Sequence, residues 1–176
     1  MICGFVLFRP MFLLAVQAFL RIEEITVSSS IMTNKIIIDL NEIEITLIPS
    51  SLTITCTFSI LSTSLQNFSQ VRLVANIRNP CIVSIMSKYL SLRDYAPGPL
   101  FVFNGKPVSQ SFFKNIFQSA LCATGLNNTH IKTHSFRIGA VTTALMKGYT
   151  YPQIQQMGRW KSQAFKNYIR VPSFKL

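Results

Sequence analysis

The sequence predicts an α+β fold, mostly helical, with one small antiparallel sheet near residues 35–75. Apolar residues recur at helical spacing in several separate stretches towards both ends of the chain. The stretches richest in β-branched residues, in contrast, lie between residues 31 and 75. The chain has 176 residues, of which 49% are hydrophobic and 13% are charged, so we expect one globular domain over residues 1–176 with its own core.

Residues 1–20 are apolar, and we interpret them as a core helix. Arg9 and Pro10 interrupt the apolar run, and the remainder, Met11–Leu20, is too short to span a membrane. Pro10 suits the first turn of a helix. A targeting segment or membrane anchor is the less favoured alternative.

The middle of the chain is predicted to form strands. Residues 31–60 read as strands, with Lys35–Leu40 and Ile43–Ile48 separated by Asn41-Glu42 as in a hairpin. Val71–Ala75 is a further predicted strand.

Two longer helices are predicted to follow the strands. The first is Cys81–Arg93, which Pro80 starts. The second begins at Ser109 or Ser111, either of which can cap it, and runs to about Ala123. The segment between the helices contains a break, a short extended piece and a turn: Ala96–Pro99, Leu100–Phe103 and Asn104–Pro107.

Residues 133–170 are predicted to form three short helices. Their boundary signals are Thr133 and Gly148 for the first helix, Pro152 and Gly158 for the second, and Ser162 for the third, Gln163–Arg170.

These short helices carry a set of side chains suited to a phosphate. His134 and Arg137 are three positions apart, so a helix places them on one face. Imidazole and guanidinium groups donate to phosphate oxygens, and guanidinium does so bidentately. Trp160 and Tyr168 can surround the same phosphate, and a tyrosine hydroxyl becomes a nucleophile when cations or a base favour its deprotonation. The structural alternative is a solvated His and Arg with a buried Trp and Tyr.

The charge distribution favours nucleic acid as the partner. The first 94 residues hold seven basic and six acidic residues, whereas residues 95–176 hold ten basic residues and no acid. When half of a chain carries only positive charges, it can bind a polyanion such as nucleic acid, because binding releases counterions. The alternatives are a solvated basic face and an anionic membrane surface. Four scattered cysteines without a C-x-x-C motif predict neither a zinc site nor a disulfide scaffold, and fit a reducing compartment.

The motif HSFRIGA at 134–140, followed by GRW-x-S-x-AFK-x-YIR at 158–170, resembles the catalytic half of tyrosine recombinases, the phage-integrase family. It is most similar to the recombinases of eukaryotic mobile elements of the DIRS or Crypton type. The similarity covers about residues 11–172 and is dense from residue 99 onward.

The resemblance implies DNA cleavage and rejoining without a metal or nucleotide cofactor. His134, Arg137 and Trp160 would contact the scissile phosphate, and Tyr168 would attack it to form a 3′-phosphotyrosine link. Double-stranded DNA would be the partner, bound by a homo-oligomer, in the nucleus or cytosol.

Arg21 and Glu24 match the first catalytic Arg of the family and the Glu that supports it. A buried guanidinium needs a carboxylate partner, which explains such a pair. The alternative is an ordinary pair at the end of a helix.

The chain departs from the family pattern in the sheet. Residues 36–87 contain no Lys, whereas a sheet hairpin in the family carries a Lys that protonates the leaving 5′ oxygen. Lys35 is the nearest substitute, and Ser50–Gln70 aligns poorly, as expected of an insertion, an intron or decay. Loss of a general acid costs about 10²–10⁴ in rate.

An N-terminal DNA-clamping domain and a C-terminal docking helix are also expected to be missing. The sequence therefore predicts an impaired recombinase or an inactive DNA-binding relic of a mobile element. An active recombinase ranks next, and a membrane-associated basic protein far behind.

Overall fold

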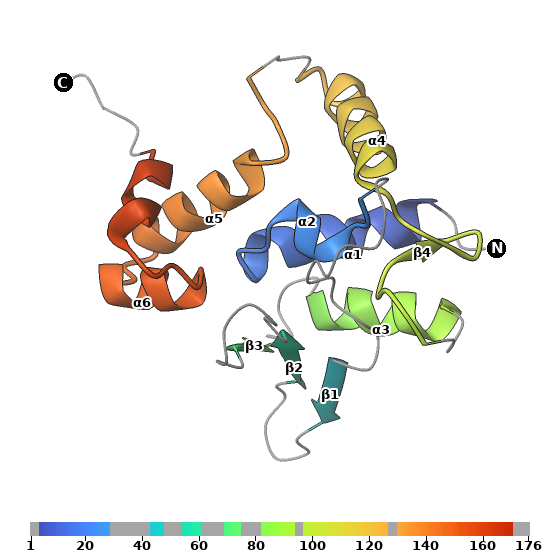
Figure 1. Ribbon diagram of the computed structural model, residues 1–176, viewed down its shortest axis with the longest axis horizontal. Coiled ribbons are helices and arrows are strands. Elements are labelled where there is room, and N and C mark those ends of the chain that lie inside the picture. Colours follow the sequence, from blue (N-terminus) through green and yellow to red (C-terminus); the bar gives the residue numbers. More distant parts are fainter. Residues whose placement is uncertain are drawn as a thin grey trace.

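The computed structural model describes residues 4–28, 43–47, 54–60, 69–74, 82–93, 97–126 and 130–170. Helix α1 runs through the middle of the molecule, with α3 and the three-stranded sheet on one side and α4 on the other (Figure 1). Helices α5 and α6 lie together at one end. The helices are α1 (Gly4–Gln17), α2 (Ile22–Ile25), α3 (Ile82–Leu92), α4 (Gln110–Ala123), α5 (Ser135–Met146), α6 (Tyr151–Met157) and the 3₁₀ helix η2 (Gln163–Tyr168).

The predicted core helix at the start of the chain is confirmed. Met11, Leu14 and Ala15 of α1 are buried in the main core. The prediction that Pro10 lies in the first turn is wrong, because α1 begins at Gly4 and Pro10 lies inside it. A proline inside a helix removes one backbone hydrogen bond. Leu7, in the turn before Pro10, is fully buried, and this packing outweighs the loss.

The small antiparallel sheet is also confirmed. It contains β1 (Ile43–Leu47), β2 (Ile54–Ile60) and β3 (Ser69–Val74) in the order β1-β2-β3. Both pairs are antiparallel, with Ile45 opposite Cys56 and Thr57 opposite Arg72. The central strand therefore comes from the stretch that aligns poorly with the family, where β-branched residues favour extended backbone. The strand predicted at Lys35–Leu40 lies outside the described residues.

A buried polar cluster joins α3 to the segment that follows it. The Tyr89 hydroxyl donates to the Leu100 carbonyl and accepts from the Val102 amide, both at 3.0 Å. Arg93 is buried, and its Nε and Nη2 donate at 2.8 Å to the carbonyls of Leu100 and Pro99. The short hairpin of β4 (Val102–Phe103) and β5 (Lys106–Pro107) follows at the predicted turn.

The start of α4 settles which serine caps it. The Ser109 side chain accepts from the Phe112 amide at 3.2 Å, so Ser109 and not Ser111 is the N-cap.

Aromatic packing anchors the beginning of α5 to α1 and α4. The ring of Phe136 stacks on Phe12 at 5.6 Å and lies 4.8 Å from Phe117. His134 and Arg137 flank Phe136 in the chain, so this packing fixes the place from which both side chains project.

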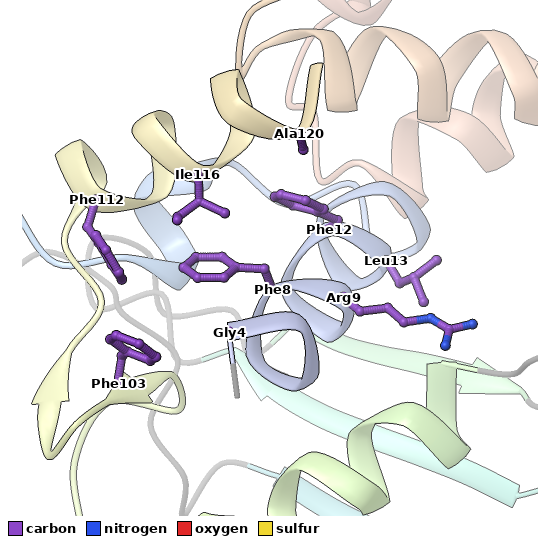
Figure 2. A pocket seen from close by; sticks show the side chains of 9 residues that line it. All are labelled: Gly4, Phe8, Arg9, Phe12, Leu13, Phe103, Phe112, Ile116 and Ala120. Atoms are coloured by element: carbon purple, nitrogen blue, oxygen red, sulfur yellow. The ribbon is translucent and has the colours of Figure 1, made fainter. Parts of the chain in front are cut away.

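Beside this cluster, α1, α4 and β4 line an apolar pocket of about 910 Å³ that is open to the surface (Figure 2). Phe8 and Phe12 of α1 face Phe112 and Ile116 of α4 across it. None of the predicted catalytic residues lines this pocket.

The boundaries of α5 and α6 follow most of the predicted signals. Gly148 ends α5 with φ +82°, and the Tyr149 amide donates back to Ala144 at 3.1 Å, as predicted. Thr133 is not the N-cap, because α5 begins at Ser135 and the Ser135 hydroxyl accepts from the Lys132 amide. That bond already closes the turn before the helix.

Helix α6 has Pro152 in its first turn and ends at Gly158, both as predicted. Ser162 caps the next element by accepting from the Ala164 amide at 3.3 Å. That element is the 3₁₀ helix η2, which ends at Tyr168, two residues before the predicted end.

Candidate active site

Four of the five predicted catalytic side chains lie in one cluster. The guanidinium carbon of Arg137 lies 4.2 Å from the ring centroid of Trp160 and 5.9 Å from that of Tyr168. The rings of His134 and Tyr168 are 4.8 Å apart, and those of Trp160 and Tyr168 are 5.6 Å apart. These residues come from α5, the turn after α6 and η2, so the three short helices bring them together.

Arg137 is the buried cation at the centre of this cluster. Its side chain is only 4% exposed, and Nη2 donates to the Gly158 carbonyl at 2.7 Å. Its Nε is buried and has no hydrogen-bond partner among the described residues. A buried donor left unpaired is costly, and in native structures it usually marks the place of a missing partner. The arrangement therefore leaves one buried donor of Arg137 unsatisfied by the described residues.

Burial lowers the pKa of Arg137 to about 10, and the nearby charge of Arg21 acts in the same direction. Arg159 lowers this pKa further, whereas Glu24 and Tyr168 raise it. Arg137 remains charged at neutral pH because its pKa stays well above 7. Its charge sits in a poorly solvated position, where it attracts an anion more strongly than an exposed cation does.

Trp160 lies directly over the backbone of Gly158. A Cβ added to Gly158 would overlap the six-membered ring of the indole, so the close approach requires glycine there. Phe19 meets the indole edge-on at 6.2 Å, with an interplanar angle of 90°. The ring therefore occupies a fixed place between the core and Arg137.

Tyr168 is held at the end of η2 by Thr142 of α5. The Thr142 hydroxyl donates to the Tyr168 carbonyl at 3.4 Å and accepts from the Arg170 amide at 3.1 Å. Thr142 had no predicted role, because a threonine in mid-helix has no distinctive local pattern.

Arg21 lies at the entrance to α2, with an exposed side chain. Its charge is near enough to Arg137 to lower the pKa of that guanidinium. The expected support of the Arg21 guanidinium by Glu24 needs correction. Glu24 instead accepts from the backbone amide of Arg21, because it lies three residues into the helix turn that Arg21 begins.

The guanidinium that Glu24 contacts belongs to Arg159. Nη2 of Arg159 lies 3.2 Å from both carboxylate oxygens of Glu24, and Nη1 donates to the Ala18 carbonyl at 3.2 Å. The sequence predicted no separate role for Arg159. Its position between Gly158 and Trp160 was the available signal, but its partners are far away in the chain.

A lysine general acid is not found in the described part of the site. Strands β1, β2 and β3 contain no lysine, and Arg72 is their one basic residue. The predicted substitute, Lys35, lies outside the described residues.

The described ranges also bear on metal binding and on membrane spanning. Those ranges contain no group of three or more His, Cys, Asp or Glu side chains placed to hold a metal ion. No helix within them is both long and apolar enough to cross a membrane.

No protein-family model and no curated protein sequence matches the chain. Solved structures do match it. The XerH site-specific recombinase, in a post-cleavage complex with its palindromic difH substrate, aligns with a TM-score of 0.62 at 12% identity. This alignment covers 98% of the present chain and 45% of XerH.

The Tn1549 transposon integrase, in complex with circular intermediate DNA, aligns with a TM-score of 0.54 at 13% identity. The match covers 94% of the present chain and 54% of the integrase. The chain thus spans about half the length of the structures it matches. At this identity the likeness concerns the fold, and it leaves the DIRS or Crypton affinity untested. The chain has the fold of the catalytic domains of tyrosine recombinases and integrases.

Proposed function

We propose that this chain is the DNA-cleaving and rejoining domain of a tyrosine recombinase, impaired by the loss of its lysine general acid. The observation that carries the proposal concerns Arg137. Its side chain is buried against Trp160 and Tyr168, and its Nε has no hydrogen-bond partner among the described residues. A phosphate oxygen is a suitable partner for that donor. The fold similarity to two DNA-bound recombinases supports the same substrate.

In the proposed reaction the Tyr168 oxygen attacks a backbone phosphate of DNA. A bond forms between this oxygen and phosphorus, and the bond from phosphorus to the 5′ oxygen breaks, which leaves a 3′-phosphotyrosine. In the absence of the lysine, the leaving 5′ oxygen takes a proton from water and becomes a 5′ hydroxyl. His134, whose ring lies 4.8 Å from that of Tyr168, takes the phenolic proton. Arg137 and Arg21 stabilise the charge on the non-bridging oxygens, and Trp160 packs against the phosphate.

Rejoining reverses these steps with a 5′ hydroxyl from the same or another strand. Attack of that hydroxyl on phosphorus releases Tyr168 and restores a phosphodiester. The chemistry needs neither a metal nor a nucleotide cofactor in this scheme.

The proposal includes double-stranded DNA as the partner, a homo-oligomer on DNA, a mobile-element origin and a nuclear or cytosolic location. Residues 95–176, with ten basic residues and no acid, support the DNA partner. The Tn1549 transposon integrase among the matched structures supports a mobile-element origin. The closer assignment to DIRS or Crypton elements rests on the motifs at 134–140 and 158–170.

The second candidate function is DNA binding without catalysis. The observation that favours it is the lack of lysine throughout residues 36–87, which include all three strands of the sheet. In the first stage of cleavage the leaving 5′ oxygen needs a proton, and the guanidinium of Arg72 is a poor donor because arginine stays protonated at neutral pH.

A suicide-substrate assay separates these candidates. The protein is incubated with nicked DNA that has ordinary phosphates and with the same DNA carrying a bridging phosphorothiolate, whose thiolate leaves without a general acid. Denaturing gels measure the covalent adduct, with Tyr168→Phe as the control, and a gel shift measures binding.

We expect an adduct on the phosphorothiolate substrate alone, at least about 10²-fold above that on ordinary DNA. Adducts on both substrates would show an active enzyme with another proton donor. DNA binding without any adduct would refute the catalytic proposal and leave the binding function.

A further inference from the structure

Arg159 has a strained backbone and a side chain that bonds to Ala18 and Glu24. Its φ is +55°, a left-handed conformation that is unfavourable for a non-glycine residue. Such a conformation persists only when surrounding contacts hold it. Those contacts include the bonds of its guanidinium to Glu24 and to the Ala18 carbonyl, and the bond from its backbone amide to the Gln156 carbonyl at 3.0 Å.

Glu24 connects these contacts to Arg21. The same carboxylate accepts from the Arg21 backbone amide and from Arg159 Nη2. The two partners belong to different elements, because Arg21 begins α2 and Arg159 immediately precedes Trp160. One carboxylate therefore joins the backbone of the first predicted catalytic arginine to the turn that carries the indole.

We propose that Arg159 is a positioning residue, which acts through Glu24 to hold Arg21 and Trp160 in register around the phosphate. This inference rests on the proposed function, since it assigns a role within the same site. We assign Arg159 no direct contact with the phosphate, because its Nη1 and Nη2 already donate to the Ala18 carbonyl and to Glu24.

The pair also controls the charge of the site. Glu24 raises the pKa of Arg137 and Arg159 lowers it, so the two charges act on this guanidinium with opposite signs. Without Arg159, the carboxylate of Glu24 would be free to pair with Arg21 or Arg137 and would oppose the binding of an anion. The ion pair thus leaves the positive charge of Arg21 and Arg137 for the phosphate.

The backbone conformation of Arg159 provides a variant that removes only the side chain. Glycine adopts positive φ readily, so Arg159→Gly removes the guanidinium without adding backbone strain. Arg159→Lys keeps the charge but loses the fork that reaches Glu24 and Ala18 together. Lys161→Ala is the matched control, because it removes one exposed positive charge from the same turn.

Two measurements test the role. Trp160 is the only tryptophan in the chain, so quenching of its fluorescence by acrylamide reports on the turn without any reaction. The rate of adduct formation on phosphorothiolate DNA reports on the site, and gel shifts measure DNA affinity separately.

For Arg159→Gly we expect stronger quenching of Trp160 and an adduct rate about 10- to 100-fold below that of the unmodified protein. DNA affinity should fall no more than in Lys161→Ala, which keeps the original quenching. Arg159→Lys should recover part of the rate.

An adduct rate for Arg159→Gly equal to that of Lys161→Ala would overturn the inference. So would a reduced rate with unchanged quenching, since Arg159 would then act on the phosphate rather than on the turn. If the unmodified protein forms no adduct, the proposed function fails, and the quenching comparison by itself supports or overturns the structural role of Arg159.

Discussion

Replacing Gly158 by alanine tests the close packing of the indole on the backbone. Gly158 has φ −87° and ψ 1°, which alanine tolerates, so the backbone itself adds little cost. The added Cβ would coincide with atoms of the Trp160 ring, and the ring must therefore leave its place. The effect is steric and local.

The magnitude follows from the contacts that the ring would lose. It lies 4.2 Å from the Arg137 guanidinium carbon, 6.2 Å from Phe19 and 5.9 Å from Phe165. A desolvated cation–π contact contributes about 1–2 kcal/mol, and each aromatic pair about 0.5–1.5 kcal/mol. Partial loss of all three predicts that Gly158→Ala lowers the free energy of unfolding by about 2–4 kcal/mol.

Urea denaturation followed by far-UV circular dichroism and Trp160 fluorescence measures this change. The matched control is Gly139→Ala, since Gly139 lies exposed within α5 and an added Cβ there meets nothing within 4 Å. That control should raise the free energy of unfolding by about 0.5–1 kcal/mol, because alanine favours a helix interior. The two substitutions are thus expected to change the free energy of unfolding in opposite directions. A Gly158→Ala protein within about 0.5 kcal/mol of the original, with unchanged emission, would refute the packing argument.

Three further predictions concern pH, capping and the polar cluster of α3. Because burial lowers the pKa of Arg137 to about 10, its charged form costs stability below that pH, and the cost is relieved as the pH rises through it. Between about pH 9 and 11, the unmodified protein should therefore gain about 1 kcal/mol relative to Arg137→Met in urea titrations, and parallel curves would contradict this. Ser109→Ala should cost about 1 kcal/mol and Ser111→Ala clearly less in the same titrations, because only Ser109 caps α4; equal losses would show that the cap is misassigned. Tyr89→Phe should lower the free energy of unfolding, measured by thermal denaturation, by about 1–3 kcal/mol, because it leaves the Val102 amide without its acceptor. The control Tyr149→Phe, at an exposed position, should change it little. An unchanged stability of Tyr89→Phe would argue against the polar cluster.

Local stop and start signals predicted the ends of several helices. Gly148 ends α5 and Ser162 begins η2, as expected, since each acts through its own backbone or a side chain two residues away. Pro10 and Thr133 were misleading for one reason. Each is a weak local preference that other contacts override. Packing of the turn before Pro10 extends α1 back to Gly4, and the competing hydroxyl of Ser135 closes the turn before α5.

The predicted catalytic residues are an intermediate case. His134, Arg137, Trp160 and Tyr168 lie within 35 positions of each other, and short helices bring them together as the spacing indicated. Their chemical roles were inferred from the resemblance and remain predictions. How deeply Arg137 is buried, and that its Nε lacks a partner in the described structure, could not be inferred from spacing.

The sequence by itself determined the fold class, the basic C-terminal half and the set of side chains able to hold a phosphate, because periodicity, charge and residue type are local properties. Only the tertiary structure decided that Glu24 pairs with Arg159, 135 positions away, and that the Trp160 ring covers Gly158. Both depend on how α1, α2 and the turn after α6 pack together. A carboxylate three residues from one arginine has no local signal that directs it to another, so its partner is set by the three-dimensional arrangement alone.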